Sequence, residues 1–567
     1  MLNDFVDIEV FSLDEALAFM RKRLKRYPHL IENESELIEL IDRLDRFPLA
    51  IEQATAYMWR TKGNGRQYLE LINKGGFAEL ENDLAKPMSG YKRTITEIFL
   101  LSYSKLREST RQLFNLCTYM SPDDIPIEFF RQRVDNFPEP LRGFLTSGDE
   151  NELIAELIDY SLVKRSGNFF SLHRFVQEVG REHLSRLDKD GAANVLNCCL
   201  EAVVGTMPDG REYGTFEQLE WFRQMSPHAE IIADQSRNMF VDSSEKQEEI
   251  GIVCHRLGVG HRSLARHKKA LEWLNKALVI REKVLGEDHP DLAATCDLIM
   301  RTLYDQGKYN EALEWIYRAV AIQEKTLGKE HLETIHTYNN IVCVQIKRGD
   351  YISASEWLRK VVAIVENVYA DMEHRSVFLT FSNIAIIHTI QGNYTKALEW
   401  HYKTLSIREK ALGKKHYDVA TSHNHISCVL DIQGKHSEAL AQNQKAFDIL
   451  VEVLGKEHPE TVKTYNTFAN IHNNMANYSE AFGWCQKALA VHKRFLGENH
   501  PETATTYHTM GSICYNQGDY DTALEWHYKA LIIREAKLGE NHPRTIETQS
   551  KIDAIKLQSN TNMKLIV

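Results

Sequence analysis

The sequence predicts an all-α protein whose C-terminal half is a right-handed solenoid of seven stacked helical hairpins. Three markers repeat in phase at intervals of 42 or 43 residues, and a fixed period of this size is typical of repeat architectures. An ALEW-like string recurs with its alanine at Ala270, Ala312, Ala354, Ala397, Ala439, Ala481 and Ala523. An LGxxHP-like string begins at Leu285, Leu327, Leu412, Leu454, Leu496 and Leu538. Five residues before the alanines stand Gly307, Gly349, Gly392, Gly434 and Gly518, with Ala265 and Ala476 in two repeats.

Each repeat is expected to form two helices joined by a turn. Ala312, Trp315 and Ile316 lie on one apolar stripe of a helix, and Gly307 just before them suits a helix stop. We interpret the six tryptophans of the second helices as packing residues rather than a ligand cage. The histidines of the LGxxHP strings are expected to start helices or pack loops rather than bind metal, because they lie on separate loops. They are His289, His331, His374, His416, His458, His500 and His542.

A single hairpin cannot bury its apolar stripe alone, so neighbouring hairpins must stack into a superhelix with a concave groove. The combined markers closely resemble the longer tetratricopeptide (TPR) repeat of kinesin light chains and nephrocystin-like proteins, over about residues 246–555. The resemblance implies that the first helix of each hairpin lines the groove. No N-terminal heptad coiled coil is visible, which disfavours a kinesin light chain itself.

A polar row along these first helices is the predicted peptide-binding site. Offsets of ten, six and three residues before the turn residue share one helix face. The candidate residues are Asn339, Asn424, Asn466, Asn470, Asn473, His508, Tyr515, Arg301 and Tyr304. An asparagine amide both donates and accepts hydrogen bonds, so it can pair with a peptide backbone. The asparagine at offset ten also resembles groove asparagines of kinesin light chains, which contact cargo peptides. The alternative is a solvated face or hydrogen bonds between helices.

The N-terminal half resembles part of an NB-ARC module, the nucleotide-switch region of STAND-type ATPases. Pro48, Leu49 and Ala50 match its GLPLA element, and His173 stands in its Met-His-Asp position with Arg174 in place of the aspartate. Residues 91–186 are therefore expected to form a winged-helix domain with a β-hairpin turning at Gly167 and Asn168. Pro48 and His173 are interpreted as vestiges of nucleotide-switch motifs.

The sequence contains no GxxxxGK[S/T] phosphate-binding loop. Two alternatives stay open: a switch ATPase that lost this loop, or the C-terminal part of a longer protein that has it. The expected domains are a helical remnant at 1–90, the winged helix at 91–186, a helical spacer at 187–245, the repeats at 246–555 and a tail at 556–567.

Composition favours a cytoplasmic interaction protein. The formal net charge of −11 argues against a general nucleic-acid or anionic-membrane partner. No long apolar run or signal peptide is present, and the nine cysteines form no CxxC pair. We expect no catalytic site, no metal and no cofactor. The expected function is a scaffold or sensor that binds partner peptides in the concave groove, and the alternative is the C-terminal part of a nucleotide-switch signalling ATPase.

Overall fold

The computed structural model describes residues 10–74, 90–208, 216–368 and 375–566, and the chain divides into two compact units. The first unit comprises residues 1–207 and 223–249, and the second comprises residues 208–222 and 250–567. None of the described helices is long and apolar enough to cross a membrane.

The first unit consists of short helices around one small sheet. Ser12 and Glu15 form a capping box at its first helix, with the Glu15 N–H donating to Ser12 Oγ at 3.3 Å. The helices are α1 (Leu13–Arg23), α2 (Glu34–Arg43), α3 (Pro48–Thr61), α4 (Gly65–Lys74), α6 (Gly90–Lys105), α7 (Glu108–Cys117), α8 (Ile127–Gln132), α9 (Leu141–Ser147), α10 (Glu150–Asp159), α11 (Arg174–Leu187) and α12 (Lys189–Thr206), with 3-10 turns at Pro28–Leu30 and Val134–Asn136. The helices α13 (Phe216–Met239) and α14 (Ser244–Ser263) each run from one unit into the other.

The sheet of the first unit is antiparallel and has the strand order β1 (Ile125–Pro126), β3 (Phe169–Leu172), β2 (Val163–Ser166). Gly167 takes a φ of 62° in the turn between β2 and β3, so the predicted hairpin is confirmed. Phe170 on the central strand is fully buried beside Phe130 of α8, with ring centroids 6.3 Å apart. This packing joins the sheet to the helices of the winged-helix fold.

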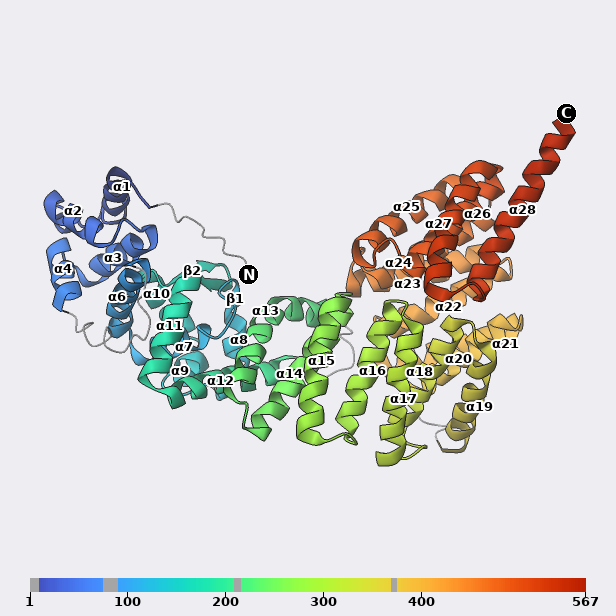
Figure 1. Cartoon of the computed structure of the whole chain (residues 1–567), viewed down its shortest axis with the longest axis horizontal. Helices are drawn as coiled ribbons and strands as arrows, with labels where there is room; N and C mark the ends of the chain where they lie inside the picture. The colour runs from blue at the N-terminus through green and yellow to red at the C-terminus, as the bar shows by residue number, and fades with distance from the viewer. Residues whose placement is uncertain (1–9, 75–89, 209–215, 369–374, 567) are drawn as a thin grey trace. The chain divides into compact units, whose positions relative to one another are not determined.

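The second unit is a row of helical hairpins (Figure 1). In the described part of the chain, α14 to α27 pair as seven hairpins, and α28 follows as a further first helix. We refer to the even-numbered helices α14 to α28 as first helices and to the odd-numbered helices α15 to α27 as second helices. Their bounds are α15 (His267–Leu285), α16 (Pro290–Asp305), α17 (Tyr309–Thr326), α18 (Leu332–Arg348), α19 (Tyr351–Val368), α20 (Arg375–Ile390), α21 (Tyr394–Leu412), α22 (Tyr417–Ile432), α23 (His436–Leu454), α24 (Pro459–Asn474), α25 (Tyr478–Phe495), α26 (Pro501–Gln517), α27 (Tyr520–Leu538) and α28 (Pro543–Ile566).

Six of the seven hairpins are held by the alanine and the tryptophan of the ALEW-like string, and in the hairpin of Ala439 the tryptophan position is Gln442. All seven alanines are fully buried, which allows the two helices to approach closely. The Trp484 ring stacks on Phe468 of the first helix with centroids 4.9 Å apart, and the Trp400 ring lies tilted against Phe381 with centroids 5.0 Å apart. The packing role predicted for these tryptophans is confirmed. Trp273 is only 2% exposed, whereas Trp400 is half-buried.

The histidines of the LGxxHP strings start the first helices, as predicted. In His289, His331, His416, His458, His500 and His542, the ring Nδ1 accepts the backbone N–H two residues later, at 3.1 to 3.2 Å. This bond satisfies one of the N–H groups that a helix start leaves unpaired. His374 lies outside the described residues. The turn residue at the other end of the first helix is left-handed throughout, with a φ of 73° at Gly307 and 61° at Ala476.

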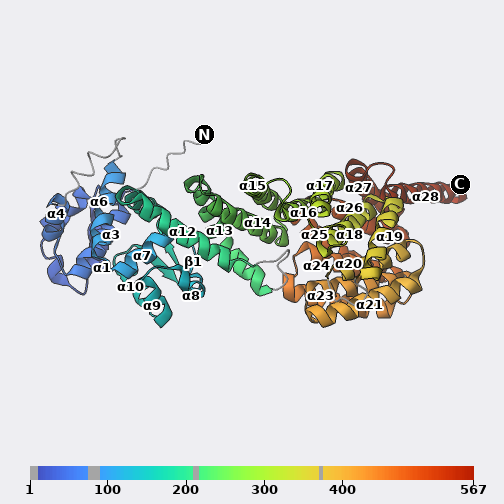
Figure 2. The ribbon, with the colours of Figure 1, turned by 90° about the horizontal axis from the view of Figure 1, so that it is seen from below.

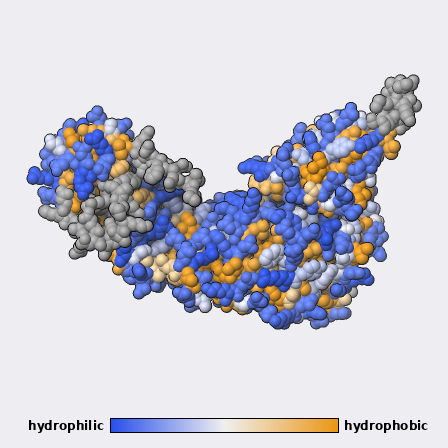
Figure 3. All heavy atoms as spheres, in the orientation of Figure 1, coloured by the Kyte–Doolittle hydropathy of each residue, from blue (hydrophilic) through white to orange (hydrophobic). Residues whose placement is uncertain are grey.

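The outer surface of the repeats carries no single large apolar area in the view of Figure 3, where hydrophobic residues form interrupted strips among hydrophilic ones. Exposed apolar side chains such as Val279, Ile352 and Ile532 lie on different second helices. Isolated apolar side chains of this kind are normal on a protein surface.

Candidate functional site on the first helices of the repeats

The superhelix closes on itself, because the C-terminal hairpins lie beside the N-terminal ones (Figures 1 and 2). The starts of α24, α26 and α28 meet the ends of α14, α16 and α18. His458 Nε2 lies 2.9 Å from the Ser263 carbonyl, His500 Nε2 lies 2.8 Å from the Asp305 carbonyl, and His542 Nε2 lies 2.7 Å from the Lys347 carbonyl. Each pair is separated by 195 residues. We name these three histidine–carbonyl contacts, together with the Lys347–Glu502 ion pair, the seam.

The two ring nitrogens of a seam histidine have different hydrogen-bonding roles. Nδ1 accepts the helix-capping bond, so the proton of the neutral ring is on Nε2 and is donated across the seam. Burial lowers the pKa of His458, His500 and His542, which favours this neutral form. One side chain therefore starts a helix and joins two distant repeats.

Proline and glycine also meet across the seam. A Cβ added at Gly307 would lie 2.7 Å from Pro501 Cγ, and one at Gly349 would lie 2.3 Å from Pro543 Cδ. These distances are shorter than van der Waals contact. By contrast, nothing lies within 4 Å of the corresponding point at Gly434. Gly307 and Gly349 are thus required by the seam as well as by their left-handed backbone.

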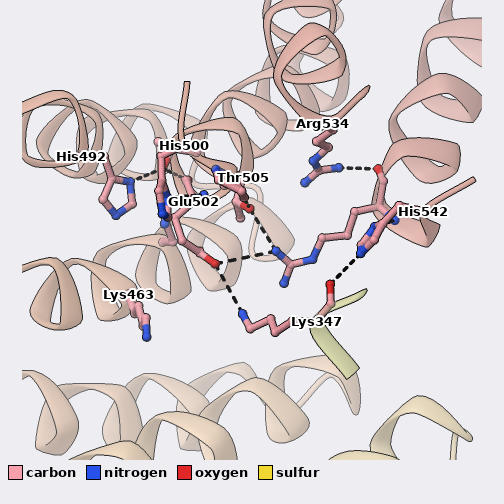
Figure 4. Close-up of polar contacts among 12 residues, drawn as sticks. Lys347, Lys463, His492, His500, Glu502, Thr505, Arg534 and His542 are labelled. Carbon is pink, nitrogen blue, oxygen red and sulfur yellow. Dashed lines mark hydrogen bonds and ion pairs between the residues drawn. The ribbon is translucent and has the colours of Figure 1, made fainter. Parts of the chain in front are cut away.

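A cluster of charged side chains lies along the seam (Figure 4). Lys347 Nζ is 3.4 Å from the Glu502 carboxylate, and Arg544 is 3.9 Å from the same group. Burial would raise the pKa of Glu502, but the Lys347, Arg544 and Lys463 cations hold it well below its ordinary value. Glu460 accepts a hydrogen bond from Tyr417 at 2.9 Å and pairs with Lys463. The cluster is balanced by ion pairs rather than poised for proton transfer.

The predicted residues at offset ten connect neighbouring helices. Asn339 is 0% exposed: its amide donates to Thr380 Oγ1 at 2.8 Å and accepts from Asn383 at 3.1 Å. Asn466 is 7% exposed and accepts from Thr506 at 3.1 Å, and half-buried Asn424 accepts from Thr467 at 3.0 Å.

His508 belongs to the same row, with its ring 4.9 Å from that of His527. In this structure the row corresponds to hydrogen bonds between helices, the alternative that the sequence left open.

The residues at offsets six and three are more accessible. Asn470 is exposed and Arg301 is half-buried. Asn473 accepts from Asn516 at 3.1 Å, and Tyr515 donates to Gln558 at 2.7 Å. The Tyr304 ring lies 5.5 Å from that of Tyr309. Of the predicted residues, Asn470 is therefore the one whose amide is best presented to a ligand.

Cys428 is a further residue of this face that the sequence analysis did not single out. It also stands six residues before its turn glycine, so the offset used for Asn470 would have found it. The residue is exposed, yet burial raises the pKa of its thiol. The Cys428 Sγ lies 3.8 Å from Thr467 Oγ1 of α24, so the thiol stands at the contact between two repeats.

Pro48 and His173, which the sequence suggested as remnants of nucleotide-switch motifs, lie in the first unit. Pro48 is the first residue of α3, and His173 caps α11 by accepting the Phe175 N–H at 3.3 Å. Burial lowers the His173 pKa, Lys164 lowers it further, and Glu52 of α3 opposes them. The fold thus places the two motif segments within electrostatic range of each other.

Family models match most of the repeat region. Models described as tetratricopeptide repeat match residues 253–291, 301–367, 376–452, 460–531 and 506–552. The repeats are tetratricopeptide repeats. Residues 101–189, which include the β-hairpin, match a model described as a domain of unknown function, DUF7779.

A curated relative is a nucleotide-binding leucine-rich repeat (NLR)-like protein from Hyaloscypha variabilis. It is 29% identical over 273 residues, which cover 46% of this chain and 25% of the relative. The chain therefore spans about a quarter of the length of the relative that it matches.

Two solved structures are similar to this chain at low identity. A STAND protein with a TPR sensor from Pyrococcus horikoshii is 13% identical, with a TM-score of 0.53 covering 98% of this chain and 74% of that chain. A kinesin light chain protein with nearly identical TPR-like repeats from Podosopora anserina is 23% identical, with a TM-score of 0.29 covering 36% of this chain and 97% of that chain. The likeness to the STAND protein shows a shared fold over nearly the whole of this chain.

Proposed function

We propose that this chain is a non-catalytic sensor or scaffold that binds a peptide segment of a partner protein on the first helices of its TPR superhelix. The observation that carries the proposal is the polar face of the first helices, which includes Asn470. The outer surface of the repeats, by contrast, has only isolated apolar side chains. An exposed amide on a helix that is rigidly packed on both sides can bond a peptide backbone without being reorganised.

The structure changes which substitutions test this proposal. Replacing Asn466 would remove its bond with Thr506 as well as any ligand contact, so stability and binding would change together. Asn470→Ala removes an exposed amide only. We expect it to weaken a bound peptide by about fivefold or more, corresponding to one hydrogen bond.

The experiment starts with selection of binders from a random peptide library displayed on phage. Fluorescence anisotropy then compares the selected peptide on the parent chain and on Asn470→Ala. As a matched control, Asn474→Ala alters an exposed amide at the end of the same helix, bonded to Asp431 at 2.9 Å. Equal affinity for all three proteins, with unchanged melting curves, would remove Asn470 from the site.

A second candidate function is the sensor half of a nucleotide-driven switch. It is favoured by the shared fold with the STAND protein, which extends over nearly the whole chain. Because the sequence has no phosphate-binding loop, we expect this chain alone not to bind ATP. Isothermal titration calorimetry with Mg-ATP tests this expectation, and micromolar affinity would contradict it.

A further inference from the structure

The seam differs from the packing inside the superhelix. From α15 onward consecutive helices pack along their lengths, whereas the three histidine–carbonyl bonds of the seam each join the start of one helix to the end of another. The contacts there include three histidine–carbonyl bonds, the Lys347–Glu502 ion pair and two close approaches of a proline to a glycine. The seam can therefore part without breaking any hairpin.

The seam is also polar. Its central groups are Lys347 and Glu502, whose side chains are 28% and 18% exposed. Charged groups of this kind regain water when the two edges separate, whereas an apolar interface would expose its surface unfavourably. Interfaces that open and close reversibly are typically more polar than permanent ones.

We propose that the seam is a latch: while it is closed, the inner face of the first helices is enclosed, and a macromolecular ligand reaches that face only when the seam opens. The inference rests on the proposed function, since it concerns access to the same binding face. Ligand binding is then coupled to a small number of bonds between repeats that are distant in the chain.

Side chains from separate repeats meet on the inner face. Cys428 of α22 is exposed, and its Sγ lies 3.8 Å from Thr467 Oγ1 of α24. Lys347 of α18, two repeats before Cys428, reaches Glu502 of α26 at 3.4 Å. The seam therefore joins the two sides of the turn that contains Cys428. Burial lowers the pKa of the neighbouring His425, and the Lys463 and Lys347 cations lower it further.

Asparagine substitutions separate the two roles of the seam histidines. Asparagine is a good helix cap, so His458→Asn, His500→Asn and His542→Asn together keep the helix starts, but the shorter side chain cannot reach across the seam. The matched control is the triple variant His289→Asn, His331→Asn and His416→Asn, which makes the same change in the same motif away from the seam.

Cys428 supplies a readout that does not depend on a ligand. Each full-length variant is treated with N-ethylmaleimide or with a polyethylene-glycol maleimide, and peptide mass spectrometry measures modification of Cys428. The bulky reagent should modify the parent and the control slowly, and the seam variant about tenfold faster or more, because two or three hydrogen bonds no longer oppose opening. Equal rates in the two triple variants overturn the latch, as does a parent that reacts equally fast with both reagents.

A glycine pair repeats the test if the seam triple variant does not fold. Gly349→Ala adds a Cβ against Pro543, whereas Gly434→Ala adds one in open space, and both backbones have a φ near +77°. The backbone strain of the two substitutions is therefore matched. Only Gly349→Ala should increase the rate at which the bulky maleimide labels Cys428. If labelling is the same in both while the selected peptide still binds the parent, the latch is wrong and the proposed function stands. If labelling follows the latch but no peptide binds, only the proposed function fails.

Discussion

The LGxxHP histidines at the seam and those away from it have the same local sequence and different surroundings. His500 and His542 are buried and bond a carbonyl 195 residues earlier in the chain. His289 and His331 cap their helices in the same way, but no repeat exists 195 residues before them, and their rings remain partly or fully exposed. A motif that resembles a local helix signal thus also makes a long-range contact in three of its six described copies.

This difference separates two levels of organisation. Capping, turn and hairpin packing are set within about 42 residues and recur in each repeat. The seam depends on how far the chain turns per repeat, which no single repeat contains. Substitutions of capping, turn or hairpin-packing residues should have similar effects in every repeat. Substitutions of seam residues should have an effect only where the two edges of the superhelix meet.

The largest effect is expected inside a hairpin. Trp273→Ala removes a ring that is 2% exposed, so the free energy of unfolding should fall by about 3–5 kcal/mol. Trp400→Ala should cost roughly half as much, because that ring is half-buried. Urea denaturation followed by circular dichroism measures both. A larger loss for Trp400 would show that hairpin packing is not a local property.

An intermediate effect is expected for the polar row. Asn339→Ala leaves Thr380 and Asn383 without their amide partner in a buried position, so we expect a loss of about 1–3 kcal/mol in unfolding free energy. Asn470→Ala should change it by less than about 0.5 kcal/mol, because the side chain is exposed. If thermal melting shows equal losses of stability for Asn339→Ala and Asn470→Ala, the residues at offset ten do not stabilise the fold more than those at offset six.

The smallest effect is a pH dependence of the seam. Burial lowers the pKa of His500; the Asp305 carbonyl and the Glu502 carboxylate oppose this, and Lys347 adds to it. A lowered pKa means that the neutral ring stabilises the fold above about pH 6.5, and that this contribution is lost as the pH falls below that value. The parent should therefore lose more stability on acidification than His500→Asn does. Parallel melting-temperature profiles for the two proteins would contradict this assignment.

The sequence was sufficient for the repeat fold because each marker has a local physical cause. The alanines, the turn glycines and the histidine caps were predicted and are found in the structure. The asparagines at offset ten were assigned to the correct helices, but helix periodicity alone does not tell an exposed row from one that bonds the next helix. Asn339 illustrates this, since its partner Thr380 lies in the following repeat.

The seam could not have been predicted in this way. No spacing within a single repeat indicates that Lys347 and Glu502 pair. Their contact depends on the small rotations between successive hairpins, summed over several repeats. The same limit applies to Cys428, whose place on the helix was predictable but whose contact with Thr467 of the next repeat was not.

The constant separation of 195 residues has a consequence for the length of the array. Each closing bond joins a first helix to the fifth one after it, so the eight first helices of the described chain form three bonds. An array shorter by one repeat would keep two, and one with five first helices would keep none. Gain or loss of whole repeats, the common way in which such genes change, would therefore adjust the strength of closure in equal steps without altering a single side chain.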